Sequence, residues 1–130
     1  MRFWSTAFLI ALSLFACVAK AAPSNPDVTA CEGSVAADII AGCSRLLQRP
    51  NLTPQQQFNV LMRRGNGYWL DKQFERALSD FDAAVRLNPK SAAALANRAG
   101  AFRETQQYDR AIADASESLK LDDKNARTYW

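Results

Sequence analysis

Acidic residues and cysteines are the side chains of this sequence that could do chemistry, because its 130 residues include no histidine. A His-based triad, an imidazole proton shuttle and an imidazole metal ligand are therefore excluded. Asp80 and Asp114 could form a carboxylate pair of the kind used for acid and base catalysis. Their separation of 34 residues is better explained by a repeated helical unit, in which such acids form outer-face salt bridges or caps. We therefore expect a protein that is not an enzyme.

Gly65-Asn66-Gly67 is the segment most like a phosphate-binding loop. It lacks the strand that precedes such loops and the lysine that follows their glycines. Small residues at these positions suit close helix packing instead. We expect neither a cofactor nor a metal ion.

An internal repeat organises the larger part of the chain. When residues 92–125 are moved back by 34 positions, they align with residues 58–91 without an insertion. A fixed period of this length, with helical spacing inside each unit, indicates a helical solenoid. The matched pairs include Leu61/Leu95, Arg64/Arg98, Ala77/Ala111, Asp80/Asp114 and Leu87/Leu121.

The first unit contains the motifs RRGNGY and FERAL, which are followed by the single residues F and A and the pair NP. The second unit contains the motifs NRAGAF and YDRAI, which are followed by the single residues A and S and the pair DD. These motifs resemble tetratricopeptide repeats. The resemblance implies two antiparallel helices per unit, with the small pairs Gly65/Ala99 and Ala77/Ala111 where the helices approach most closely. It predicts an all-α solenoid with repeats at 58–91 and 92–125 and the start of a third at 126–130.

Helix ends follow from capping chemistry. Thr53 can accept a hydrogen bond from the backbone of Gln56, Gln56 can return one, and Pro54 suits the first helical position. Asn88-Pro89 ends a later helix, because proline cannot continue it. Together with the repeat, these signals predict helices at 54–70, 73–87, 91–104 and 107–120.

The resemblance also implies a binding surface. Similar repeat proteins hold an extended peptide or a partner helix on the concave surface formed by the first helix of each unit. Six residues there are selected as partner-binding residues: Met62, Asn66, Trp69, Asn97, Arg103 and Arg127. Other inward candidates are Asn59, Arg63, Leu70, Ala93, Ala96, Gly100, Glu104 and Trp130.

Two interpretations compete for some of these residues. Asn66, Asn97 and Arg127 resemble part of the clamp by which chaperone-binding tetratricopeptide domains grip a C-terminal carboxylate. Met62 stands where that clamp has lysine, so ordinary lining of the groove is favoured. Met62, Trp69 and Trp130 are also candidate interface hot spots, although Trp69 could equally pack on the preceding capping helix.

The N-terminal residues 1–21 have the pattern of a secretory signal peptide. Arg2 precedes an apolar run, and Ala19-Lys20-Ala21 predicts cleavage after Ala21 and export to the bacterial periplasm. The run is slightly short for a membrane anchor. The alternative is a lipoprotein, because the segment ending at Cys17 resembles a lipobox, although Phe15 suits that pattern poorly.

A flexible arm and a capping helix are expected next. Residues 22–33 have the composition of a flexible arm. Residues 34–53 are expected to form an N-terminal capping helix and turn, with Ser34 as its cap and its apolar face against the first repeat. That face consists of Val35, Ile39, Cys43, Leu46 and Leu47.

Cys31 and Cys43 are the cysteines that remain after the predicted cleavage. An even pair in an exported chain favours a structural disulfide, worth about 2–3 kcal/mol. A buried free thiol at Cys43 is one alternative, and a redox-active or metal-binding pair is another. The lack of histidine and of a Cys-x-x-Cys motif disfavours the latter.

Charge and register complete the expectations. The net charge of +3 falls to about +1 without residues 1–21, and basic and acidic residues are interleaved, so no nucleic-acid partner is expected. Tyr129 falls in the register of Leu95, so residues 126–130 begin a third repeat. Because this repeat is incomplete, we expect the last face of the solenoid to be uncovered. The tail, a protein partner or a second copy could cover it, but a longer chain is favoured, because the register continues without a stop signal. A separate alternative is that the module recruits substrates as part of a longer enzyme.

Overall fold

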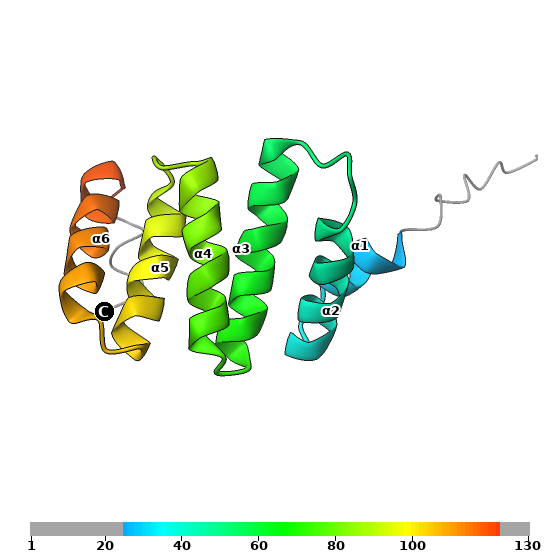
Figure 1. The fold of residues 1–130 in the computed structure, drawn as a ribbon, viewed down its shortest axis with the longest axis horizontal. Coiled ribbons are helices and arrows are strands. Elements are labelled where there is room, and N and C mark those ends of the chain that lie inside the picture. Colours follow the sequence, from blue (N-terminus) through cyan, green and yellow to red (C-terminus); the bar gives the residue numbers. More distant parts are fainter. Residues whose placement is uncertain (1–24, 123–130) are drawn as a thin grey trace, which may run out of the picture.

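The computed structural model describes residues 25–122, and all elements in this range are α-helices (Figure 1). They follow one another in a single row, in which each helix packs against the next one in the chain. The expected all-α helical-repeat solenoid is confirmed. The helices are α1 (Pro26–Cys31), α2 (Ala36–Leu47), α3 (Pro54–Leu70), α4 (Phe74–Leu87), α5 (Ala92–Glu104) and α6 (Tyr108–Leu121).

The four helices of the repeats lie where capping chemistry predicts them, to within one residue. The backbone N–H of Gln56 donates to the Thr53 hydroxyl at 3.2 Å, and the Thr53 N–H donates to the Gln56 side chain at 2.9 Å. Ser91 caps α5 in the same manner by accepting from the Ala94 N–H at 3.2 Å. These local bonds satisfy N–H groups that a helix leaves without a partner at its start.

The turns inside the two repeats have the same backbone conformation. Lys72 and Gln106, which stand 34 residues apart, have φ values of 57° and 60°. In each turn the residue that follows donates a backbone hydrogen bond of 2.8 Å. The Gln73 N–H donates to the Tyr68 carbonyl, and the Gln107 N–H donates to the Phe102 carbonyl. The repeat found in the sequence is therefore also a repeat of backbone geometry.

Helices α3 and α4 approach closely at Gly65, as predicted. A Cβ atom built on Gly65 would lie 2.5 Å from the ring of Phe81, which is only 1% exposed. Ala77 is fully buried in the same cluster. In the second repeat Ala115 stands in the register of Phe81, so Ala99 can stand in the register of Gly65.

Replacing Gly65 with alanine is expected to lower the free energy of unfolding by about 1–2 kcal/mol. The collision with Phe81 costs about 1–3 kcal/mol, and the better helix propensity of alanine offsets up to about 1 kcal/mol. Urea unfolding measures the change. In a Phe81→Ala background the Gly65→Ala cost should vanish, because the second repeat tolerates that alanine pair; an unchanged cost would refute the collision.

The predicted flexible arm is wrong for residues 26–31, which form α1. Asn25 accepts from the Asp27 N–H at 2.9 Å, and Pro26 occupies the first helical turn. Asn-Pro-Asp is thus a helix start, whereas prolines and small polar residues had indicated only flexibility. Helix α1 reaches α2 at Gly42, where an added Cβ would lie 2.6 Å from the Cys31 backbone nitrogen.

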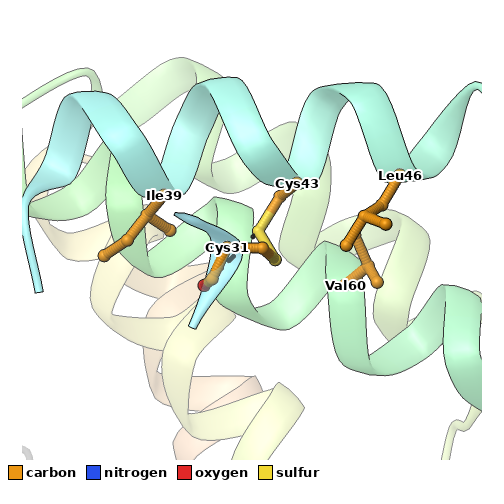
Figure 2. Close-up of a cluster of buried hydrophobic side chains, with 5 residues drawn as sticks. All are labelled: Cys31, Ile39, Cys43, Leu46 and Val60. Atoms are coloured by element: carbon orange, nitrogen blue, oxygen red, sulfur yellow. Dashed lines mark hydrogen bonds between the residues drawn. A yellow bond between two sulfur atoms is a disulfide. The ribbon is translucent and has the colours of Figure 1, made fainter. Parts of the chain in front are cut away.

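Helix α2 packs between α1 and α3. It begins at Ala36 after Val35, and no side chain caps it, so the predicted Ser34 cap is wrong. Val35 is 56% exposed, so its predicted place on the buried apolar face is wrong. Figure 2 shows Ile39, Cys43 and Leu46 of α2 gathered with Cys31 of α1 and Val60 of α3 in one buried cluster.

The sulfur atoms of Cys31 and Cys43 lie 1.99 Å apart in this cluster, and their Cα atoms are 4.7 Å apart (Figure 2). Both side chains are buried. The last residue of α1 therefore lies directly against the middle of α2.

Several predictions concern residues outside the described range. They are the signal peptide at 1–21, a lipid on Cys17, and the third repeat at 126–130 with Arg127, Tyr129 and Trp130.

No helix between residues 25 and 122 combines the length and the apolar character needed to cross a membrane.

Candidate functional site

A groove of about 820 Å³ runs between the N-terminal helices and the repeats. Helix α1 and its C-cap form one wall, α3 forms the other, and the start of α5 closes the far side. Its lining consists of Val28, Cys31, Glu32, Leu46, Arg49, Leu52, Gln56, Phe58, Asn59, Val60, Met62, Arg63, Asn66, Ser91 and Ala93.

Five of the residues predicted to face inward line this groove, namely Asn59, Met62, Arg63, Asn66 and Ala93. Among the six selected partner-binding residues, the groove thus brings together Met62 and Asn66. Met62 is half-buried and packs against the cores of both repeats, whereas Asn66 is exposed. The remaining described members, Trp69, Asn97 and Arg103, do not line the groove.

Asn97 is only 8% exposed and donates a hydrogen bond from its amide nitrogen to the Asn66 side-chain oxygen at 3.1 Å. This bond joins α3 to α5. The two asparagines of the supposed carboxylate clamp therefore contact one another, and Asn97 is largely shielded from a ligand. The structure favours lining and helix positioning over a clamp.

Trp69 packs between the two repeats. Its ring lies edge-on to Phe74 at 5.2 Å between centroids. An added Cβ on Gly100 of α5 would lie 3.1 Å from the Trp69 ring, so glycine leaves room for it. The alternative of packing on the capping helix is wrong, because α2 meets α3 at Gly67 on the other side.

The charged side chains of the groove have partners. Arg63 lies 4.0 Å from Glu32 across the groove. Arg49 bonds Asp27 at 3.0 Å, and Arg45 bonds the same carboxylate at 2.5 Å. The two arginines of the α2 end thus hold α1 through its single acid.

The Arg45 hydrogen bond lowers the pKa of Asp27 below its usual value of 3.8; partial burial opposes this lowering, and the Arg49 bond adds to it. A carboxylate with a lowered pKa stabilises the folded state above its unfolded pKa and loses that contribution as pH falls through its folded pKa.

The attachment of α1 is therefore expected to weaken below a pH of about 3.8 and to be pH-independent between about 5 and 7. Backbone NMR resonances of Val28 and Thr29 would report the change as the sample is acidified. In Asp27→Asn, which cannot titrate, the same resonances should lack the acidic transition. A transition that persists in this variant would assign the pH dependence to another group.

The repeated acids Asp80 and Asp114 form salt bridges, as predicted, but inside the repeats and not on an outer face. Arg64 of α3 bonds both oxygens of Asp80 of α4 at 2.8 and 2.7 Å. Arg98 of α5 bonds both oxygens of Asp114 of α6 at 2.6 and 2.9 Å. The Asp80 hydrogen bond raises the pKa of Arg64 above its usual range.

A second, smaller hollow of about 260 Å³ lies on α5 and α6, at the other end of the row. It is formed by small residues with the exposed Tyr108 and Ile112 beside them, and Arg103 lies at its rim instead of in the groove. Ala115 stands here in the register of Phe81, so the absent ring leaves the hollow.

The sequence interpretation missed the part of the groove contributed by α1, Val28 and Glu32, and also Leu52 and Phe58. The Asn25-Pro26-Asp27 start signal could have identified α1. No local signal in the sequence predicts that α1 lies opposite α3, because this placement depends on long-range packing.

Residues 58–91 match the family model described as Tetratricopeptide repeat. The matched range is that of the first of the two repeats found in the sequence. No curated protein matches the chain.

Proposed function

We propose that this chain, whose residues 58–91 match the tetratricopeptide repeat model, is a non-catalytic scaffold that holds a protein partner in the groove between α1 and α3. Tetratricopeptide repeats generally bind protein partners. The partner would enter as an extended peptide or as a helix. The observation that carries this proposal is the lining of the groove, where apolar side chains and amide side chains lie together.

The size and the composition of the groove support the proposal. Its volume of about 820 Å³ lies within the range typical of ligand sites, about 300–1,000 Å³. Phe58 and Met62, which are both partly buried, offer apolar contact area, and Asn59 and Asn66 carry amides that can bond a peptide backbone. Met62 is suited to this role because its unbranched side chain adapts to different partners.

The test is a comparison of two double variants of the purified full-length chain. Circular dichroism first establishes that both are folded, because Met62 is half-buried. Met62→Ser/Asn66→Ala alters the groove, and Leu70→Ser/Arg86→Ala alters two exposed positions outside it. Proteins from an envelope extract that are retained by the wild type are identified by mass spectrometry. A partner lost by the groove variant and kept by the control supports the proposal; a partner kept by both places binding elsewhere.

The proposed compartment is the periplasm. Two features support it: the signal-like residues 1–21, and two buried cysteine sulfurs at bonding distance. Disulfides persist in oxidising compartments such as this one.

Mass analysis of the protein isolated from cells tests this proposal. An N-terminus at Ala22 and resistance of both cysteines to alkylation before reduction would support it. An N-terminus at a lipid-modified Cys17 would favour the envelope lipoprotein instead. An intact N-terminus together with alkylation of Cys31 and Cys43 before reduction would refute export.

A further inference from the structure

Helix α1 has only six residues, so its own backbone bonds cannot keep it folded and in place. Three attachments to α2 do so. Cys31 meets Cys43, Asp27 bonds Arg45 and Arg49, and the α1 backbone rests on Gly42. The position of α1 therefore depends on side chains of α2 and of the turn that follows it, and two of the attachment residues, Cys31 and Arg49, also line the groove.

Helix α1 also forms a wall of the groove. Val28 and Glu32 both line it, and Glu32 faces Arg63 of α3 at 4.0 Å. Because α1 adds this wall, one end of the groove is bounded on two sides. If α1 moved away, that end would be open to solvent.

The charged and apolar residues at this end of the groove determine which kind of ligand side chain fits there. Each charged side chain of the lining has an opposite charge beside it: Glu32 with Arg63, and Arg49 with Asp27. The neighbouring Val28 is apolar and partly buried, and it packs against a cluster that contains the buried Leu46 and Val60. A charged side chain of the ligand would lose hydration here and would find every charged group of the lining already paired. An aliphatic or aromatic side chain of the ligand would instead bury apolar area.

We propose that α1 is the specificity wall of the groove: Val28 contacts a large apolar side chain of an extended peptide, and the Cys31–Cys43 pair positions this wall. The inference rests on the proposed function of the groove and deepens it. It adds a class of ligand and assigns to the two cysteines a role in recognition besides their role in stability.

The experiment uses the full-length chain and a peptide array as a defined probe. Each peptide is a heptamer of Gly and Ser with one central residue, which is Leu, Phe, Lys or Glu. We expect the wild type to retain the Leu and Phe peptides about ten-fold more strongly than the Lys and Glu peptides.

Three variants separate the parts of the proposal. Val28→Ser alters the contact, and Cys31→Ser/Cys43→Ser releases the wall; each should reduce the preference for Leu and Phe by about ten-fold. Val35→Ser is the matched control, because Val35 is exposed and lies outside the groove. It should bind as the wild type does.

Hydrogen exchange gives a readout that needs no ligand. In Cys31→Ser/Cys43→Ser the amides of residues 28–32 should exchange at least about ten-fold faster, while those of α3 to α6 stay protected. Unchanged exchange would overturn the positioning role of the cysteines. Gly42→Ala, which pushes the α1 backbone away without removing a sulfur, should give the same loss of peptide preference as the double cysteine variant.

The array outcomes distinguish this inference from the proposed function. If the wild type retains Leu and Phe peptides and Val28→Ser retains them equally, the groove binds peptides but α1 is not its specificity wall. If the wild type prefers Lys or Glu peptides, the assigned ligand class is wrong. If it retains no peptide, both the inference and peptide binding in the groove fail.

Discussion

Replacing Phe81 with alanine is expected to lower the free energy of unfolding by about 3–5 kcal/mol. The ring is 1% exposed and fills the space beside Gly65, where the absence of a Cβ allows α3 and α4 to approach. Truncation removes buried apolar area and leaves a cavity that rigid helices close only in part. Because domains of this size are stable by about 5–15 kcal/mol, the variant should be close to unfolding at ordinary temperature.

Urea unfolding followed by circular dichroism measures this effect. Phe81→Leu provides a graded variant in case the alanine protein does not fold, and it should lose clearly less. The matched control is Leu70→Ala, because Leu70 is 62% exposed in the same repeat; its cost should be below about 0.5 kcal/mol. Equal losses in Phe81→Ala and Leu70→Ala would show that Phe81 does not anchor the repeat.

Replacing Asp80 with alanine is expected to cost about 2–3 kcal/mol. Asp80 is 4% exposed and accepts two hydrogen bonds from the Arg64 guanidinium. Without it, Arg64 keeps its bond to Ser44 at 3.3 Å but loses its counter-charge in a partly desolvated place. Removing one partner of a buried pair leaves the other charge uncompensated, which costs more than the net contribution of the pair.

Asp82→Ala is the matched control in the same helix. Asp82 bonds Arg98 at 2.8 Å and also pairs with Arg86, but Arg98 retains both bonds to Asp114 when Asp82 is removed. Its loss should cost less than about 1 kcal/mol. The double variant Arg64→Met/Asp80→Ala should recover part of the Asp80→Ala loss. A double variant that is less stable than Asp80→Ala would contradict the uncompensated charge as the cause.

These two predictions concern residues that the sequence placed with different success. The 34-residue register identified Gly65 and Ala77 as close-packing positions and Asp80 as a salt-bridge residue, and the structure agrees with these assignments. The register did not show that Asp80 is buried, because residues on the buried side and on the exposed side of a helix recur with the same period. Only the position of α3 against α4 decides which side of α4 is covered.

The residues of the candidate site were also predicted with different success. Met62 and Asn66 were found from the repeat, since the same turn of each first helix faces the same direction. Trp69 and Asn97 were expected in the groove, but they lie at the joint between α3 and α5, because Gly100 leaves space there for the indole ring. Such fine differences in packing follow from the side chains on both helices and not from one of them.

The sequence by itself determined the helical repeat, the ends of its four helices and the small residues at their close approaches, because periodicity, caps and turns are local properties of the chain. Only the tertiary structure decided that α1 exists as a wall, that its last residue, Cys31, meets α2, and that a groove lies between α1 and α3. A six-residue helix is marginal alone, so its formation and its place depend on contacts with residues distant in the sequence.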